Sequence, residues 1–454
     1  MSEDARTLDA KLPGRFKPYP TYKDSGVEWL GEIPVHWEVK RLKALASVQL
    51  SNVDKKSVEG QETVRLCNYT DVYYNERITP ELDFMAATAT QEQVRRFSLR
   101  AGDVLITKDS ESWTDIAVPA VVSENLPDVL CGYHLAHIRP TDGVIGEFLS
   151  RTFSAIGLRD QFQIAANGIT RFGLGGDAIR TGMFAVPPEP EQRAIAAFLD
   201  RETARIDALM AKKERLIELL QEKRTALITR AVTRGLDPTV PMKDSGVEWL
   251  GEIPAHWEVG ENRWLFRESD SRSLLGEEEL LTVSHITGVT RRSEKPNVTM
   301  IEAESHEGYK ICRQGELAIN TMWAWMGALG IAREPGMVSP SYNVFSIASV
   351  RLVGAYYDYL CRIPLHVNEI IRRSKGIWHS RLRLYPDAFR DIQTPLPSKS
   401  EQRTIAAFLD RETARIDALI AKIRDAIDRL KELRTALISV AVTGKIDVRE
   451  EAIA

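Results

Sequence analysis

The sequence predicts two α/β (α+β) domains separated by two long antiparallel coiled-coil helices, arranged as an internal repeat with approximate two-fold symmetry. Three observations support this architecture. The block EQRAIAAFLDRETARIDAL at 191–209 returns at 401–419 with one residue changed, and the block KDSGVEWLGEIPVHWEV at 23–39 returns at 243–259, again with one residue changed. After each EQR block, apolar residues continue at the spacing of a coiled coil.

Composition places the chain among globular proteins. Its 454 residues give room for about three domain-sized units, and a hydrophobic fraction of 43% is ordinary for packed cores. The first residues lack a signal-peptide pattern, and the most apolar run, 322–332, is far shorter than the ~20 residues of a membrane span. We therefore expect a cytoplasmic protein with no membrane partner. A net charge of −4 does not indicate a nucleic-acid binder, but a whole-chain sum can hide a local basic surface.

Signatures of catalysis are absent from the sequence. It contains no GxxxxGK[ST], HExxH, GxSxG or CxxC motif, and the glycines at 173–176 lack the spacing of a dinucleotide fingerprint. The four cysteines are scattered, with no histidine at metal-ligand spacing, and are predicted to be buried thiols. We expect a chain that is not an enzyme, with no catalytic residues, no metal and no cofactor of its own.

We call the repeated block at 23–39, and its copy at 243–259, the strap of each half. The first strap follows a polar leader and places Trp29 and Trp37 among turn residues. One interpretation makes the strap a connection between domain and helices. The other, favoured for the two side chains, makes both tryptophans ordinary core residues of the first domain.

The inserts between strap and EQR block share almost no sequence but repeat a rhythm of short β-rich runs and turns. The turn Arg100-Ala-Gly-Asp103 is answered by Arg313-Gln-Gly-Glu316. This rhythm predicts the same α/β fold in both inserts. Constant frames around different inserts suggest two modules that do one kind of job on different targets, although faster divergence of the inserts is an alternative.

Each EQR block opens a long predicted helix with heptad spacing. Ser398-Lys-Ser-Glu401 has the pattern of a capping box, and Gly235 and Gly444 are placed as left-handed C-terminal caps. The predicted seam comprises Leu199, Ile206, Leu209, Leu216, Leu220 and Leu227 in the first helix, and Leu409, Ile416, Leu419, Ile423, Leu430, Leu433 and Leu437 in the second. Four further apolar residues, Phe198, Met210, Phe408 and Ile420, either accept helices of a partner protein or pack on the neighbouring insert.

The predicted division of the chain follows from these blocks. It comprises a leader at 1–18, a first α/β domain at 19–190, a first helix at 191–235, a linker at 236–242, a second α/β domain at 243–397, a second helix at 398–446 and a tail at 447–454.

Candidate DNA-binding residues lie near the end of each insert and in the loop after an earlier strand. Arginine and lysine suit phosphate contacts, and Asn, Ser, Thr and Arg can hydrogen-bond to base edges. A solvated cationic surface is the alternative for any one of them. The candidates are Lys108, Ser110, Ser112, Asn167, Thr170 and Arg171 in the first insert, and Asn320, Thr321, Arg372, Arg373, Lys375, His379, Arg381 and Arg383 in the second.

The combined pattern resembles the specificity subunits of type I restriction-modification systems. The resemblance rests on KDSGVEWLGEIPxHW at the start of each half, on the proline-rich lead into EQRxIAAFLDRETARIDAL, and on RTALI followed by AVT near each helix end. It covers nearly the whole chain, in the order of the family.

This resemblance implies two target recognition domains, each of which reads one half of a bipartite site in double-stranded DNA. It also implies that the helices set the spacer and dock two modification subunits, and that restriction subunits join the full complex. S-adenosylmethionine and ATP are expected on those partner subunits, and none on this chain. The alternative is a coiled-coil scaffold with two protein-binding modules, which would have no sequence-dependent affinity for DNA.

Overall fold

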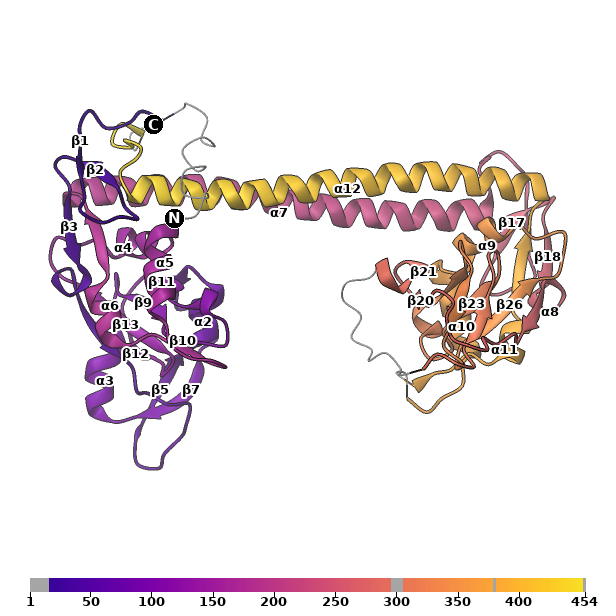
Figure 1. Ribbon diagram of the computed structural model, residues 1–454, viewed down its shortest axis with the longest axis horizontal. Helices are drawn as coiled ribbons and strands as arrows, with labels where there is room; N and C mark the ends of the chain where they lie inside the picture. Colours follow the sequence, from indigo (N-terminus) through magenta and orange to yellow (C-terminus); the bar gives the residue numbers. More distant parts are fainter. Residues whose placement is uncertain (1–15, 295–304, 379–380, 452–454) are drawn as a thin grey trace. The chain divides into compact units, whose positions relative to one another are not determined.

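The computed structural model describes residues 16–294, 305–378 and 381–451, and the chain forms two compact units (Figure 1). Unit 1 comprises residues 1–213 and 424–454, and unit 2 comprises residues 214–423. Each unit holds a mixed α/β domain together with parts of two long helices, α7 (Glu189–Arg234) and α12 (Lys399–Val442). The boundaries of the compact units therefore fall inside the helices, whereas the sequence suggested boundaries at the helix ends.

Unit 1 is organised around a five-stranded sheet whose central strands are covered on both faces. All four residues of β9 (Val104–Thr107) are buried. Because side chains alternate along a strand, Val104 and Ile106 face a core shared with helices, whereas Leu105 faces a second core shared with a four-stranded sheet. An uninterrupted apolar run is typical of a strand that is buried on both faces.

The five-stranded sheet of unit 1 has the order β4 (Ala46–Leu50), β13 (Leu135–Pro140), β9, β11 (Pro119–Val122) and β6 (Arg77–Ile78). The four-stranded sheet has the order β7 (Met85–Ala89), β5 (Glu62–Cys67), β12 (Leu126–Cys131) and β8 (Ser98–Leu99). Three two-stranded sheets pair β1 (Tyr22–Asp24) with β2 (Glu32–Pro34), β3 (Glu38–Arg41) with β15 (Met183–Val186), and β10 (Asp109–Ser110) with β14 (Phe172–Gly173). Its shorter helices are α2 (Tyr69–Tyr74), α3 (Gln91–Phe97), α4 (Gly146–Phe153), α5 (Ile156–Ala165) and α6 (Gly176–Thr181).

The main sheet of unit 2 has the same arrangement as β4, β13, β9 and β11 in the five-stranded sheet of unit 1. Its four-stranded sheet runs β19 (Phe266–Ser269), β26 (Asn343–Ile347), β23 (Leu317–Ile319) and β24 (Leu329–Ile331). The predicted equivalence of the two turns is confirmed, because Asp103 accepts from the Arg100 N–H at 2.8 Å and Glu316 accepts from the Arg313 N–H at 2.7 Å.

The other strands of unit 2 form the pairs β16 (Met242–Asp244) and β17 (Glu252–Pro254), β18 (Glu258–Glu261) and β27 (Gln393–Leu396), β20 (Leu281–Ser284) and β21 (Gly288–Arg291), and β22 (Lys310–Cys312) and β25 (Gly336–Val338). Its shorter helices are α8 (Asn262–Leu265), α9 (Gly354–Leu360), α10 (Pro364–Arg373) and α11 (Pro386–Arg390).

The glutamate of each EQR block binds the strap. In unit 1, Glu191 accepts hydrogen bonds from the Trp37 indole at 2.9 Å and from the Tyr19 hydroxyl, and it contacts His36 Nε2 at 2.8 Å. In unit 2, Glu401 accepts from the Trp257 indole at 3.0 Å. Both interpretations of the strap therefore hold for Trp37, which is a fully buried core residue and also joins the strap to α7.

The glutamine of each EQR block binds main-chain atoms of the α/β domain in its unit. Gln192 accepts from the Ile145 N–H at 2.9 Å and donates to the carbonyls of Gly143 at 3.1 Å and Pro187 at 3.0 Å. Gln402 does the same in unit 2, accepting from the Val353 N–H at 2.8 Å and donating to two carbonyls. Each glutamine therefore joins three segments at the start of a long helix.

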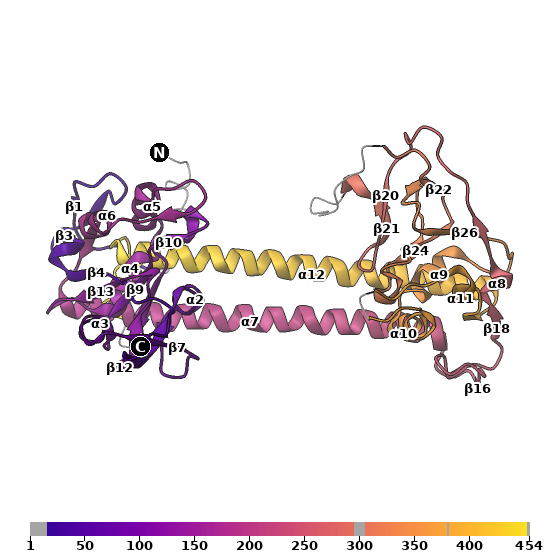
Figure 2. The same ribbon diagram turned by 90° about the horizontal axis from the view of Figure 1, so that it is seen from below.

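Within each unit α7 and α12 run side by side, as Figure 2 also shows, and ion pairs join them. In unit 1 Arg434 Nε lies 2.9 Å from Asp207, and in unit 2 Arg224 Nε lies 3.1 Å from Asp417. These pairs are equivalent by the repeat, since each residue of the second helix lies 210 positions after its counterpart in the first.

The seam prediction is wrong for Leu209, Leu216 and Leu419, which are each 44% exposed. The next residue is less exposed in each case: Ile420 is buried, at 6% exposure, whereas Met210 and Ile217 are half-buried. The other predicted seam residues are buried or half-buried: Leu199, Ile206, Leu220, Leu227, Leu409, Ile416, Ile423, Leu430, Leu433 and Leu437.

A free partner-binding face is likewise contradicted for Phe198, which is fully buried, and for Ile420. The Phe198 ring packs edge-on against Phe16, with 5.3 Å between the ring centroids. Met210 and Phe408 are half-buried against the hydrophobic cores of their own units. The alternative, packing on the neighbouring domain, therefore describes this face better.

The helix ends follow the predicted caps in part. Gly235 and Gly444 adopt φ of +76° and +72°, the left-handed conformation that ends a helix. Ser398 Oγ accepts from the Glu401 N–H at 3.2 Å, which is the first half of the predicted capping box. The second half is missing, because the Glu401 carboxylate binds Trp257 of the strap.

The four cysteines are buried and free, as predicted, and burial raises the pKa of each thiol. In the described part of the chain, no helix has the length and apolarity that crossing a membrane requires. Most of the predicted leader, residues 1–15, and the last three residues of the predicted tail lie outside the described residues.

Acid is expected to destabilise unit 2 through His366, which is fully buried in its core. Burial lowers the pKa of this imidazole from 6.5 to about 4. Between these values the unfolded chain binds a proton that the folded chain does not, so stability falls as the pH falls from 6.5 to 4, by on the order of 3 kcal/mol. Urea unfolding at a series of pH values should detect this slope, and His366→Leu should remove it. An equal slope in both proteins would contradict the assignment.

Candidate nucleic-acid interface

The two candidate loops of unit 1 lie against each other. Strand β10 pairs with β14, so Asp109 lies opposite Gly173 and Ser110 lies opposite Phe172. This pairing places the loop at 108–113, which follows β9, beside the loop at 167–173, which follows α5. Residues separated by about 60 positions in the sequence therefore form one surface.

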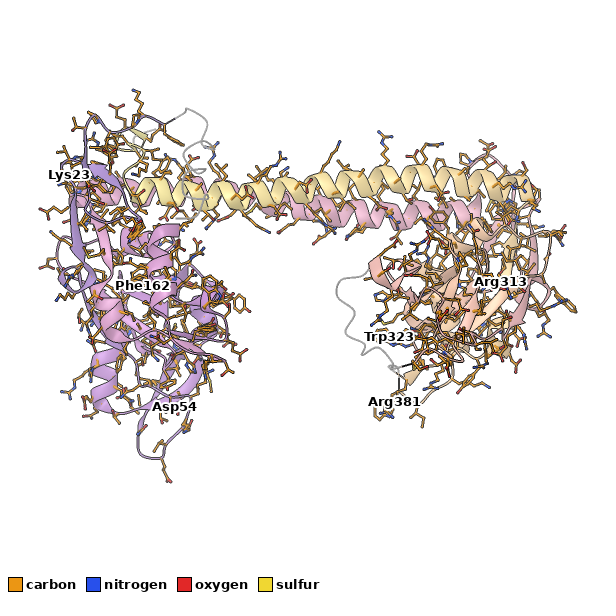
Figure 3. The ribbon with its side chains drawn as sticks, in the orientation of Figure 1. Lys23, Asp54, Phe162, Arg313, Trp323 and Arg381 are labelled. Carbon is orange, nitrogen blue, oxygen red and sulfur yellow. The ribbon has the colours of Figure 1, made fainter. Side chains whose placement is uncertain are left out.

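Unit 2 brings its candidate loops together in the same way. The Leu384 N–H donates to the Thr321 carbonyl at 3.2 Å, which joins the loop after β23 to the segment after α10. Lys375 and Arg383 close that segment by exchanging two backbone hydrogen bonds of 3.0 Å. Trp323 and Arg381, labelled in Figure 3, belong to these two loops, and their side chains are exposed.

Two candidate side chains of unit 1 are buried and interact with other residues of the protein. Lys108 is buried, with its ammonium 2.5 Å from Asp109 and 4.8 Å from the centre of the Tyr133 ring. Ser110 is also buried, within 3.2 Å of the Tyr69 hydroxyl. Lys108 and Ser110 therefore do not offer free donors to a ligand in this structure.

The remaining candidates of unit 1 differ in exposure and contacts. Ser112 caps a short 3-10 helix by accepting from the Thr114 N–H at 3.3 Å. Asn167, Thr170 and Arg171 are exposed in the loop after α5. These three residues present an amide, a hydroxyl and a guanidinium, which suit contacts with bases and phosphates.

In unit 2 the basic run divides into paired and unpaired residues. Arg372 and Arg373 both bind Glu369, an acid one turn earlier that the sequence interpretation did not include. Lys375, Arg381 and Arg383 are exposed and have no side-chain partner among the described residues. They are the cations of this run that remain available for phosphate. His379 lies outside the described residues.

The two candidate side chains in the loop after β23 form hydrogen bonds within the protein. Asn320 is buried and donates to the Tyr342 hydroxyl at 2.8 Å, and its carbonyl oxygen has no partner within the described structure. Thr321 Oγ1 donates to the Ser341 carbonyl at 2.9 Å. Both side chains support the loop rather than project from it.

Exposed aromatic residues lie beside these candidates in both units. Trp113 is 51% and Tyr133 49% exposed in unit 1, and Trp323 is 49% and Trp378 68% exposed in unit 2. Such large aromatic rings are usually buried, so their exposure in polar loops favours contact with a ligand. Aromatic and cationic side chains together are typical of surfaces that bind nucleic acids.

The fold is that of subunits of type I restriction-modification systems. The chain superimposes with a TM-score of 0.65 and 16% identity on a chain from a structural study of complex assembly and conformational transition in the type I R-M system, covering 90% of this chain and 98% of the other. For the HsdS subunit from Thermoanaerobacter tengcongensis, the TM-score is 0.53 at 15% identity, with coverage of 91% and 98%.

Two curated relatives are named as specificity subunits of type I restriction enzymes. The chain is 24% identical to the putative type I restriction enzyme MjaX specificity subunit of Methanocaldococcus jannaschii over 237 residues, 51% of this chain. It is 22% identical to the type I restriction enzyme EcoBI specificity subunit of Escherichia coli over 310 residues, 62% of this chain. The matches span 53% and 62% of those relatives. No protein-family model matches the chain. The family resemblance found in the repeated motifs is confirmed by these relatives.

Proposed function

We propose that this chain is the DNA sequence-specificity subunit of a type I restriction-modification complex, in which each recognition domain reads one half of a bipartite site. The observation that carries this proposal is the repeat itself. Two units hold the same strap and helix contacts, whereas the loops that meet at the candidate interface differ in nearly every side chain. A constant frame with two different reading surfaces suits a protein that recognises two different half-sites.

Recognition would divide between phosphate and base contacts. Lys375, Arg381 and Arg383 supply unpaired cations for phosphates, whose neutralisation releases counterions and makes the affinity depend on salt. Asn167 and Thr170 supply the hydrogen-bonding groups that read base edges. In this assignment α7 and α12 form an antiparallel coiled-coil spacer, which sets the half-sites about one turn of DNA apart on the same face.

In the same proposal the chain catalyses nothing. Two modification subunits dock on the helices and carry S-adenosylmethionine, and restriction subunits that use ATP complete the assembly. No bound cofactor is needed in this chain, because its candidate residues are suited to contact and not to group transfer. In this proposal the two recognition domains comprise residues 19–190 and 243–397.

The test is selection of DNA by the chain mixed with its candidate modification subunit, from duplexes with two randomised half-sites and varied spacers. We expect enrichment of a split motif with one fixed spacer. Converting Lys375, Arg381 and Arg383 to alanine should weaken binding to every duplex and reduce the log–log salt slope by up to about 3, whereas converting Asn167 and Thr170 to alanine should blur one half-site only. Arg267→Ala, which removes an exposed cation from β19, is the control. A complex that forms but selects no motif would contradict the proposal and favour a scaffold.

A further inference from the structure

Two isoleucines occupy equivalent places at the tips of the candidate loops. Ile169 in unit 1 and Ile377 in unit 2 are each 95% exposed. Each follows a glycine in the segment after the equivalent helix, α5 or α10. The inserts share almost no other sequence at this surface, so the same exposed side chain occurs twice in different surroundings.

The loop backbone explains why these side chains project. Asn167 and Gly173 exchange hydrogen bonds of 3.0 and 2.8 Å, just as Lys375 and Arg383 close the other loop. A Cβ atom on Gly168 would lie 1.9 Å from the Arg171 carbonyl oxygen, and one on Gly376 would lie 2.7 Å from that of Arg381. Only glycine fits beneath that carbonyl.

Each isoleucine is therefore displayed on a closed loop beside an exposed arginine. Ile169 shares its loop with Arg171, and Ile377 shares its loop with Lys375 and Arg381. An isoleucine that is 95% exposed contributes almost nothing to the core, since hydrophobic stabilisation scales with the area removed from water. A position beside exposed cations is complementary to a groove of DNA, where phosphates flank the base edges and the thymine methyl groups.

We propose that Ile169 and Ile377 are base-contacting residues, each of which inserts its side chain against the base pairs of one half-site while the neighbouring arginine holds the adjacent phosphate. This inference rests on the proposed function and adds an apolar contact to it. The side chain packs on a thymine methyl group or enters an opened base step, both of which proteins read with apolar residues.

An apolar contact has a signature that a phosphate contact lacks. Burying an isoleucine side chain excludes water without neutralising charge, so its removal should weaken binding equally at all salt concentrations. Removal of the arginine in the same loop should reduce the salt slope. The comparison of Ile169→Ala with Arg171→Ala therefore separates the two roles within one loop.

The experiment measures affinity of the complete complex for its selected duplex, and for an unrelated duplex, across a salt series. We expect Ile169→Ala and Ile377→Ala each to weaken specific binding about tenfold, with an unchanged salt slope and unchanged binding to the unrelated duplex. When the DNA selection is repeated with each variant, the sequence preference should relax at one half-site only. The affected half-site should differ between the two variants.

Matched controls remove an exposed apolar side chain elsewhere in the same unit. Val35→Ala is one, since the second strap has Ala255 at that position, and Val350→Ala is the other; the side chains are 50% and 81% exposed. Both should bind as the parent protein does. Unchanged specificity and affinity in the two isoleucine variants would overturn the inference while leaving the proposed function intact. A parent complex with no sequence preference would overturn both.

Discussion

Replacing Trp37 with alanine is expected to lower the free energy of unfolding of unit 1 by about 3–5 kcal/mol. The indole is fully buried and lies at the start of α7 and the end of α12, since a Cβ on Gly444 would approach its ring to 3.2 Å. Its loss would leave a cavity and remove the N–H that binds the buried carboxylate of Glu191. Calorimetry and urea unfolding would measure the loss.

Two variants control this prediction. Trp37→Phe retains most of the apolar volume and loses the N–H, so it should cost less than Trp37→Ala. Trp257→Ala removes the equivalent indole, which is also fully buried, and should destabilise unit 2 by a similar amount. A change below about 1 kcal/mol for both alanine variants would be typical of a surface substitution and would refute the role assigned to the strap.

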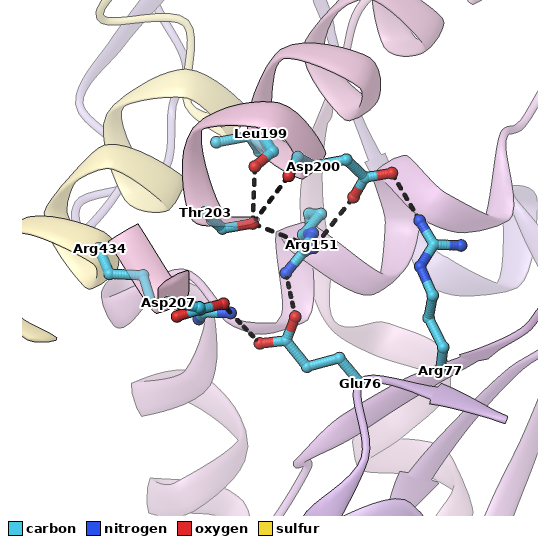
Figure 4. Close-up of polar contacts among 8 residues, drawn as sticks. All are labelled: Glu76, Arg77, Arg151, Leu199, Asp200, Thr203, Asp207 and Arg434. Carbon is cyan, nitrogen blue, oxygen red and sulfur yellow. Dashed lines mark hydrogen bonds and ion pairs between the residues drawn. The ribbon is translucent and has the colours of Figure 1, made fainter. Parts of the chain in front are cut away.

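Replacing Arg434 with alanine is expected to cost about 2 kcal/mol, whereas the equivalent Arg224→Ala should cost at most about 1 kcal/mol. In unit 1 Arg434 joins Asp207 of α7 to Glu76 of the α/β domain, and Arg151 joins Glu76 to Asp200 (Figure 4). The Arg434 side chain is only 19% exposed, and its removal takes the partner from Asp207 and leaves Glu76 paired with Arg151 alone.

Among the described residues of unit 2, no acid of the α/β domain pairs with Arg224, the counterpart of Arg434. Arg224 is 38% exposed and pairs with Asp417, and Tyr359, which lies where Arg151 lies in unit 1, donates to Asp410 at 2.7 Å. Equal losses for the two arginine variants, measured by urea unfolding at neutral pH, would show that the bridge through Glu76 adds nothing.

The pH dependence of the Arg434 variant provides a second check. Burial raises the pKa of Glu76, but the charges of Arg151 and Arg434 outweigh it and hold the pKa below the usual 4.5. A carboxyl with a lowered pKa contributes its full stabilisation above the unfolded value and loses it as the pH falls through the folded value. The difference between parent and Arg434→Ala should therefore shrink as the pH falls below 4.5, and a difference that grows in acid would contradict the ion-pair explanation.

Local patterns predicted much of the fold, and one ambiguity explains the main error in the helices. Apolar residues occur there as adjacent pairs, such as Leu209 with Met210 and Leu419 with Ile420. Either member of a pair satisfies heptad spacing, and a straight helix drifts by about 20° per heptad relative to the repeat. Which member turns inward depends on the neighbouring helix and domain, which periodicity does not contain.

The candidate site was predicted less well because side-chain pairing is a long-range property. The exposed residues of the loop after α5 were found because glycine and polar residues identify a turn. The burial of Lys108 against Tyr133 and of Asn320 against Tyr342 depends on residues more than 20 positions away. Glu369 also pairs with the first two arginines of a basic run whose own sequence contains no acid.

The glutamine contacts at the start of α7 and α12 bear on how such a chain changes during evolution. Gln192 and Gln402 bind main-chain N–H and C=O groups, which any domain offers whatever its side chains. A foreign domain that ends in the same backbone geometry would meet the same three hydrogen bonds without any adjustment of the helix. Recombination at the repeated blocks could thus bring in a new domain in one step, while the assembly that surrounds it is inherited unchanged.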